Sequence, residues 1–191
     1  MLNIVIFGAP GSGKGTYSAR IKETFNLEHI STGDVLRAEI KNGTELGKTA
    51  KEYIDSGQLI PDELMTGILG NVYDNLPAGC KGVILDGFPR TIAQAEALDK
   101  MLQERGEKVS TVIGLEVEDA ELIQRIIARG KTSGRADDNE DTAKKRLDTY
   151  YSQTLPLKDF YVAQGKYAKI CGMGDIDAIY ADISKAIKAA E

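Results

Sequence analysis

A glycine-rich turn near the N-terminus constrains the fold of this chain more than any other feature. Residues 8–16 (GAPGSGKGT) follow a short apolar run over 2–7 and precede a helix-like segment over 17–25. A strand, a glycine-rich turn and a helix, in that order, are the setting of a phosphate-binding loop. Glycines let several backbone N–H groups point at one spot, and the helix adds the positive end of its dipole. The competing interpretation, a flexible turn that merely contains a lysine, does not account for the flanking strand and helix.

The loop departs from the general pattern at one position. The general motif has Ser or Thr directly after the lysine, where the hydroxyl reaches Mg²⁺. Here Gly15 follows Lys14, and Thr16 comes one residue later. This variant resembles the loop of the nucleoside monophosphate kinases, which need a second substrate site elsewhere in the chain.

Size and charge limit the classes of function. The chain has 191 residues, enough for one α/β domain with small insertions, and a formal net charge of −5 argues against a nucleic-acid partner. The only long apolar run ends at Gly8, so neither a membrane span nor a secretory signal is expected. Two cysteines, Cys80 and Cys171, are too few for a cysteine-based zinc site and suggest a reducing, cytoplasmic location.

The arginines are concentrated near the motifs, whereas the lysines are spread along the chain. Because the arginine fork matches two phosphate oxygens at once, this distribution favours small phosphorylated ligands over a merely solvated surface. The six arginines concerned are Arg37, Arg90, Arg125, Arg129, Arg135 and Arg146.

Apolar runs and helix signals alternate along the chain, which predicts an α/β fold with a parallel sheet covered on both faces. The expected strands are 2–7, 27–30, 82–86, a part of 109–117, and 167–171. The expected helices are 17–25, 35–40, 44–56, 61–76, 91–106, 120–128, 139–161 with a kink at Pro156, and 175–190. Segments 31–60 and 128–138 contain no expected sheet strand and are candidate movable insertions. Ligands of such folds bind at the carboxyl ends of the strands.

Several polar residues near these ends allow two interpretations each. Asp86 ends a buried strand and is placed to hold the water shell of Mg²⁺. Thr32 is either a ligand contact or, like Asp34, a helix cap. Gln94 lies three residues after Thr91 and is either a capping-box side chain or a base-reading amide. His29, the single histidine, is expected to be a strand residue with no role as a base.

Arg125 and Arg129 share a second ambiguity, because both follow Glu121 at spacings of four. That spacing is typical of a solvated ion-pair face, but it would also aim two cations at one anion.

Taken together, the motifs closely resemble those of the adenylate kinases, in order and over essentially the whole chain. The matching stretches are GAPGSGKGT at 8–16, STGDVLR at 31–37, GQLIP at 57–61, DGFPRT at 86–91, TSGR at 132–135 and DDNE at 137–140. The resemblance implies a P-loop NTPase fold with a five-stranded parallel sheet and helices on both faces. It divides the chain into a core (1–30, 61–127 and 139–191), a small helical AMP-binding insertion (31–60) and a short lid (128–138). It also implies reversible transfer of the γ-phosphoryl group of ATP to AMP, giving two ADP.

The family's site residues carry over position by position. ATP would be held by Gly11, Ser12, Gly13, Lys14, Gly15, Thr16, Arg125, Arg129 and Gly174. AMP would be held by Thr32, Gly33, Arg37, Gln58, Leu59, Ile60, Gly87, Phe88, Pro89, Arg90, Gln94, Arg135 and Arg146. Catalysis would rest on Lys14, Arg90, Arg129, Arg135 and Arg146, with Mg²⁺ near Asp86, and no zinc site is implied.

The implied partners are ATP, AMP and ADP, for a cytoplasmic monomer that engages neither nucleic acid nor membrane. A UMP/CMP kinase of the same fold is the nearest alternative, but that family usually has Ala in place of Thr32 and Asn in place of Gln94. A guanine-nucleotide switch would need an Asn-Lys-x-Asp stretch, which the chain lacks. A non-catalytic nucleotide sensor is a further alternative, although every charged group that the reaction needs is in place.

Overall fold

The five expected strands form one parallel sheet in the computed structural model, which describes residues 1–191. The strands are β1 (Leu2–Gly8), β2 (Glu28–Ser31), β3 (Gly82–Asp86), β4 (Thr111–Glu116) and β5 (Tyr167–Cys171). Their order across the sheet is β2-β3-β1-β4-β5, and every neighbouring pair is parallel. The predicted fold class is confirmed, with β1 at the centre of the sheet.

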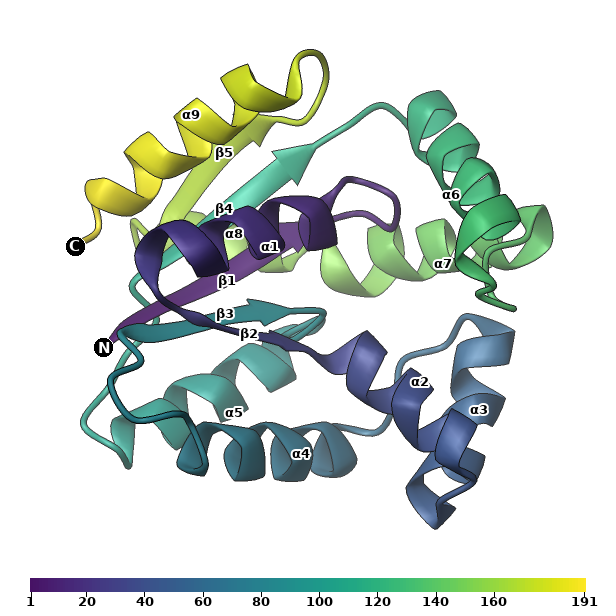
Figure 1. Ribbon diagram of the computed structural model, residues 1–191, viewed down its shortest axis with the longest axis horizontal. Coiled ribbons are helices and arrows are strands. Elements are labelled where there is room, and N and C mark those ends of the chain that lie inside the picture. The colour runs from purple at the N-terminus through teal and green to yellow at the C-terminus, as the bar shows by residue number, and fades with distance from the viewer.

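Helices cover both faces of the sheet (Figure 1). The helices are α1 (Lys14–Phe25), α2 (Thr32–Asn42), α3 (Glu45–Ser56), α4 (Asp62–Asp74), α5 (Ile92–Gln103), α6 (Asp119–Ser133), α7 (Glu140–Thr149), the π-helical turn η1 (Tyr150–Thr154), α8 (Leu157–Ala163) and α9 (Ile176–Lys188). None of them is both long enough and apolar enough to cross a bilayer.

Alternation along β1 divides the core into two layers. Ile4 and Ile6 belong to a cluster shared with α1 and α9, whereas Val5 and Phe7 belong to a cluster shared with α4, α5 and α8. All four side chains are at most 4% exposed. Successive residues of a strand point to opposite faces, so a continuous apolar run is what a strand buried on both sides requires.

Two pairs of helices lie beyond the carboxyl edge of the sheet, to the right in Figure 1. One pair is α2 with α3, which are packed against each other, and the other is α6 with α7. The chain therefore places a helical pair on each side of the edge where the expected ligand site lies.

The start of α2 differs from the expectation. Ser31, not Thr32 or Asp34, is the N-cap, and its hydroxyl accepts a hydrogen bond from the Asp34 N–H. The Thr32 hydroxyl instead donates to the Asp86 carbonyl oxygen at 3.3 Å, across to the neighbouring strand end. Thr32 is therefore buried beside the site and does not cap the helix.

The helices after β4 also differ from the expectation. Helix α6 continues to Ser133 and ends at Gly134, whose φ of 65° is left-handed, so the first half of segment 128–138 is helical. The expected long helix over 139–161 is divided by η1, in which the Leu155 N–H donates to the carbonyl of Tyr150, five residues earlier. Pro156, which has no N–H to continue the ladder, precedes α8.

Gly114 tests the packing of the sheet. A Cβ at this position of β4 would overlap the ring of Tyr167 on β5. We expect Gly114→Ala to lower the free energy of unfolding by about 2–3 kcal/mol through overpacking, as measured by denaturant titration. Gly67→Ala on the exposed surface of α4, where a Cβ meets nothing within 4 Å, is the control and should be neutral or stabilising by up to about 1 kcal/mol. Equal stability of wild type and Gly114→Ala would contradict the packing described.

Candidate active site

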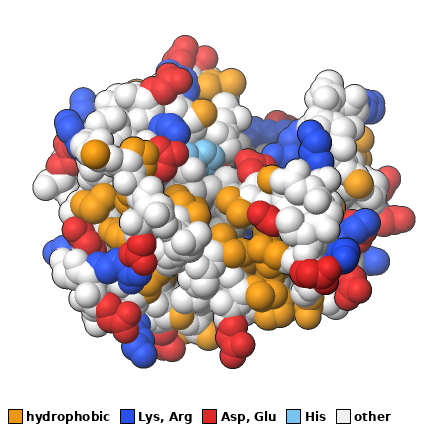
Figure 2. Space-filling model, turned by 60° about the horizontal axis from the view of Figure 1, so that its bottom comes forward, with side chains coloured by type: hydrophobic (Ala, Val, Ile, Leu, Met, Phe, Trp, Pro, Cys, Tyr) orange, Lys and Arg blue, Asp and Glu red, His pale blue; other side chains and the backbone are white.

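A cavity of about 670 Å³ lies at the carboxyl edge of the sheet. Lys and Arg side chains gather in the notch between the two lobes of the space-filling view (Figure 2). The cations that line the cavity are Lys14, Arg37, Arg90, Arg125, Arg129, Arg135 and Arg146, against the two carboxylates Asp34 and Asp86. In a chain of net charge −5, this concentration of positive charge marks a site for a polyanion.

The glycine-rich loop forms one wall of the cavity. Gly11 and Gly13 have φ angles of 84° and 97°, a left-handed backbone that favours glycine. They let the loop curl around the start of α1, so that backbone N–H groups and the helix dipole face the cavity. The hydroxyl of Ser12, in the same loop, is buried without a hydrogen-bond partner.

Lys14, the first residue of α1, has its ammonium folded over this loop. Its Nζ donates to the carbonyl oxygens of Gly8 (2.9 Å) and Ala9 (3.1 Å). Burial lowers the pKa of Lys14 to about 8; Asp86 partly opposes this shift, whereas Arg90, Arg146 and Arg129 add to it. A bound phosphate would supply the missing negative charge.

Asp86 ends β3 beside the loop and is largely buried. Burial raises the pKa of this carboxyl, but the hydrogen bond with His29 and the charges of Lys14 and Arg90 outweigh that effect and hold it below its ordinary value. The distance from His29 Nε2 to Asp86 Oδ2 is 3.4 Å. Asp86 is therefore an ionised carboxylate, and His29 is a neighbour of the site that the sequence interpretation had set aside.

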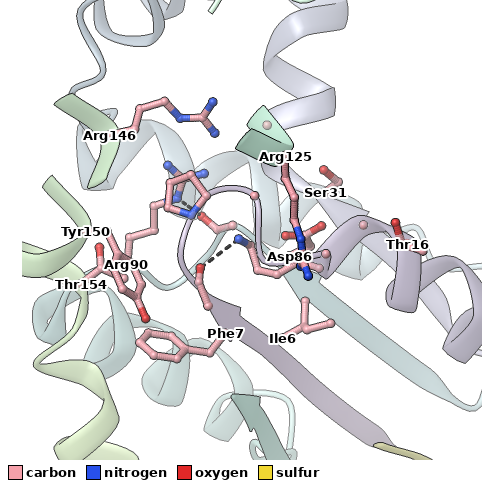
Figure 3. A pocket seen from close by; sticks show the side chains of 18 of the residues that line it. Ile6, Phe7, Thr16, Ser31, Asp86, Arg90, Arg125, Arg146, Tyr150 and Thr154 are labelled. Atoms are coloured by element: carbon pink, nitrogen blue, oxygen red, sulfur yellow. Dashed lines mark hydrogen bonds between the residues drawn. The ribbon is translucent and has the colours of Figure 1, made fainter. Parts of the chain in front are cut away.

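Arg90 and Arg146 point into the same space from different parts of the chain (Figure 3). Arg90 follows β3, and its Nε donates to the Gly87 carbonyl at 2.7 Å. Arg146 lies on α7, where burial lowers the pKa of its guanidinium to about 10. The charges of Arg90 and Arg146 both lower the pKa of Lys14, and the charge of Arg90 also lowers the pKa of Arg146. The fold therefore holds these cations close together although they repel one another.

Asp138 holds the guanidinium of Arg129 through both carboxylate oxygens, each at 2.7 Å. The Asp138 side chain is completely buried, and it also accepts from Arg146 at 3.4 Å. Asp137 accepts from Arg146 at 3.0 Å. Burial raises the pKa of Asp138, but the bonds and charge of Arg129 bring it below the ordinary value. The two aspartates thus orient two arginines toward the cavity.

Asp34 connects the two sides of the cavity. Its Oδ1 accepts from Arg37 on its own helix at 2.6 Å and from Arg135, which follows α6, at 3.1 Å. The Asp34 carboxylate thus pairs with two arginines, Arg37 and Arg135, that the sequence analysis assigns to phosphate binding. It is an anion of the protein itself in the place expected for a phosphate.

A smaller pocket of about 60 Å³ adjoins the large cavity. Its walls include Leu36, Ile54 and Met65 together with Gln94, whose side chain is only 2% exposed. Thr91 caps α5 through the Gln94 N–H, but the Gln94 side chain does not return to the Thr91 N–H; its Oε1 accepts from the Arg90 N–H at 2.7 Å. The capping-box interpretation is therefore only half correct, and the amide faces a pocket.

Most of the residues expected in the site line one of these two spaces. The large cavity contains Gly11, Gly13, Lys14, Gly15, Thr16, Gly33, Arg37, Leu59, Asp86, Gly87, Pro89, Arg90, Arg125, Arg129, Arg135, Arg146 and Gly174. The smaller pocket adds Thr32, Gln58, Ile60 and Gln94. Ser12 and Phe88 line neither, and the ring of Phe88 belongs to the core. Arg125 shows both of its expected roles, because it pairs with Glu121 at 2.8 Å and also faces the cavity.

Comparison with known proteins decides the family. The family model for adenylate kinase matches residues 6–166. The chain is 67% identical over 187 residues to the adenylate kinase of Bacteroides thetaiotaomicron, with 98% of each chain covered. It is 65% identical to the adenylate kinases of Bacteroides fragilis (98% of each chain covered) and Phocaeicola vulgatus (98% of this chain and 99% of the relative).

The chain belongs to the adenylate kinase family. It is an enzyme with the P-loop NTPase fold, and the resemblance inferred from its motifs is confirmed.

Three contacts in this adenylate kinase were not expected from the sequence. They are the Asp34 bridge, the Asp138 support of Arg129 and the His29–Asp86 pair. The sequence analysis uses the DDNE stretch only as a family motif and gives its aspartates no role. Arg129 and Asp138 are nine residues apart, and no helical periodicity predicts a contact at that separation. His29 could have been noticed, since it lies on the strand next to the one that Asp86 ends.

The lowered pKa of Lys14 predicts proton uptake when a nucleoside triphosphate binds to this adenylate kinase. At pH 9, above the pKa of about 8, the free amine is mostly neutral, and phosphate favours its protonated form. Calorimetric titrations with Mg-ATP in buffers of different ionisation enthalpy should show uptake of up to about one proton at pH 9 and much less from this group at pH 7. Lys14→Arg, whose charge does not titrate in this range, should abolish the difference; persistence of the uptake in that variant would contradict the assignment.

The two-oxygen bond from Asp138 predicts a loss of turnover in Asp138→Asn. The amide would present an N–H group to one of the two donors of Arg129, so the guanidinium should shift. A misplacement of about 1 Å can lower kcat about 100-fold, and steady-state kinetics measures this directly. Asp141→Asn, which changes an exposed carboxylate three residues later, in the first turn of α7, should keep normal turnover. Normal kcat in folded Asp138→Asn would show that Arg129 needs no such support.

Proposed function

We propose that the transfer of the γ-phosphoryl group of ATP to AMP, which this adenylate kinase catalyses to give two ADP, takes place across the junction of the two pockets. The observation that carries the proposal is that Arg90 and Arg146 line both spaces. One space contains the phosphate loop, and the other contains an apolar wall with the buried amide of Gln94, as the base of a second nucleotide would need. The phosphates of two nucleotides would then meet at these two guanidinium groups.

The roles follow from the positions of the cations. Lys14 and the backbone of residues 11–16 would bind the phosphates of ATP, while Arg125 and the Gly174 backbone would complete its site. Arg37 and Arg135, released from Asp34, would bind the phosphate of AMP. Arg90, Arg129 and Arg146 would bear on the phosphoryl group in transit, where fixed positive charge lowers the barrier without reorganisation.

No general base is needed in this reaction. The nucleophile is a phosphate oxygen of AMP, which is already ionised at neutral pH, so the protein's task is alignment, charge neutralisation and exclusion of water. Closure of segments 31–60 and 128–138, as insertions distinct from the core, would exclude water and suppress hydrolysis of ATP. The contact between Asp34 and Arg135 shows that these two segments already meet.

The donor groups near the loop fit Mg²⁺ held by one carboxylate and by substrate phosphates. Asp86 is ionised and adjoins Lys14, while no cluster of three or more His, Cys, Asp or Glu side chains offers a closed metal cage. Mg²⁺ characteristically keeps several waters and bridges phosphates in such sites. When bound, the ion would neutralise phosphate charge, and Asp86 would hold its water shell. We further propose a cytoplasmic, monomeric enzyme that engages neither nucleic acid nor membrane.

Preference for AMP over UMP and CMP is proposed from Thr32 and Gln94. Both line the smaller pocket, and a glutamine amide can pair with the amino group of adenine and an adjacent ring nitrogen. A pyrimidine kinase of the same fold and a silent nucleotide sensor are the alternatives, and no contact of this site favours either.

Product analysis tests the proposed reaction. Purified protein with Mg²⁺ and ATP should form ADP rapidly when AMP is the acceptor, and far more slowly with UMP, CMP, GMP or water alone. Preferred transfer to UMP or CMP would keep the fold and mechanism but overturn the roles of Thr32 and Gln94. Release of phosphate without an acceptor, or no turnover at all, would contradict the proposal.

Removal of the loop cation should abolish most of this activity. Lys14→Ala is expected to lower kcat/KM for ATP by at least about 1,000-fold, since charge stabilisation of this kind accounts for several kcal/mol of the barrier in phosphoryl transfer. Circular dichroism should show an intact fold. Lys22→Ala, on the same helix and partly exposed, is the matched control and should retain activity. Near-normal turnover of Lys14→Ala would rule out the assigned role of the loop.

A further inference from the structure

Asp62, the first residue of α4, contacts the amide of Gln94 from outside the two pockets. Its Oδ1 accepts a hydrogen bond from Gln94 Nε2 at 2.7 Å, although the two residues are 32 positions apart in the chain. Asp62 lines neither space, and nothing in the sequence motifs singles it out. It is therefore placed to act on a ligand only through Gln94.

Two hydrogen bonds together fix which way the Gln94 amide points. The Arg90 N–H, which can only donate, requires the oxygen Oε1 on its side, and the distance is 2.7 Å. The Asp62 carboxylate, which can only accept when ionised, requires the amide nitrogen on the other side. A flipped amide would set donor against donor at Arg90 and acceptor against acceptor at Asp62. The bond to Asp62 is also the stronger kind, because one partner is charged.

The fixed amide leaves a defined pattern of donors and acceptors for a ligand. An amide has two N–H groups and two oxygen lone pairs, and each of the two bonds uses one of these four positions. One N–H and one lone pair remain, on a side chain that is 2% exposed and lines the smaller pocket. Adenine offers an amino donor beside a ring-nitrogen acceptor, which matches this pattern. Hypoxanthine offers a carbonyl acceptor beside a ring N–H, which is the reverse pattern and would require the flipped amide.

We propose that Asp62 is a positioning residue for base selection, which holds the Gln94 amide in the orientation that accepts a 6-amino purine and rejects a 6-oxo purine. The inference rests on the proposed function of the smaller pocket as the monophosphate site. It extends that function, because it assigns discrimination between AMP and IMP to a carboxylate that touches neither nucleotide.

The test compares AMP and IMP as acceptors of phosphoryl from Mg-ATP in wild type, Asp62→Asn and Asp62→Ala. Asn keeps the shape of Asp but can present either an oxygen or an N–H group to Gln94, so both amide orientations become possible. Ala removes the partner altogether. Both variants should lower the ratio of kcat/KM for AMP to that for IMP by about tenfold or more, the value of a hydrogen bond to a charged group. The change should appear in KM, with kcat for AMP within about twofold of wild type.

Glu63→Ala is the matched control. Glu63 is an exposed acid in the same first turn of α4, so its removal has the same effect on the helix dipole without touching Gln94. The ratio of kcat/KM for AMP to kcat/KM for IMP should be the same in Glu63→Ala as in wild type.

The possible outcomes separate the inference from the proposed function. A merely structural role of Asp62 would lower kcat/KM for both acceptors by the same factor, and an unchanged ratio in both Asp62 variants would overturn the inference while the function stood. Failure of wild type to phosphorylate AMP would overturn the proposed function, and with it the inference. A relaxed ratio in Glu63→Ala as well would assign the effect to the helix terminus and would likewise overturn the role of Asp62.

Discussion

Repulsion among the partly buried cations at the carboxyl edge of the sheet is the constraint on which the rest of this structure depends. Lys14, Arg90 and Arg146 are all partly buried in one region, and their withdrawal from water lowers the pKa of each of them. Such a group of charges is stable only if rigid elements hold it and if anions lie nearby. The sheet provides this rigidity: β1 and β3 are neighbours, so the loop after β1 and the turn after β3 lie side by side. Helix α7 places Arg146 at the same cavity.

The protein itself supplies anions to these cations. Asp138 and Asp137 hold Arg129 and Arg146, while Asp34 joins Arg37 to Arg135. The two kinds of partner differ in their surroundings. The Asp138 side chain is fully buried and paired with its arginine, whereas the Asp34 side chain is more than half exposed, and under the proposed function it would exchange its cations for phosphate. Under the proposed function, the same positive charges that oppose folding would bind the two nucleotides and neutralise the phosphoryl group during its transfer.

Much of this arrangement could be predicted from the sequence, and the exceptions have a common cause. The loop over 8–16, the strand ending at Asp86 and the alternation of strands and helices depend on local patterns, so the sheet followed from them, and the residues predicted to bind phosphate line one cavity. The bond between Asp62 and Gln94 joins residues that no periodicity relates, as does the bridge from Asp34 to Arg135. The expected helix over 120–128 ends too early, because Gly130 lies inside α6 and the left-handed residue at its end is Gly134.

Thermal unfolding with an inorganic polyphosphate tests the central claim most directly. Tripolyphosphate carries the charge of a nucleotide without its base, so it should bind the clustered cations and stabilise the folded enzyme. At about 100 times its dissociation constant it should add about 2.7 kcal/mol to the stability, and therefore raise Tm by about 5–10 °C above the value in sodium chloride of equal ionic strength. An equal Tm in the two salts would show that the cations do not act as one polyphosphate site, and would contradict this account.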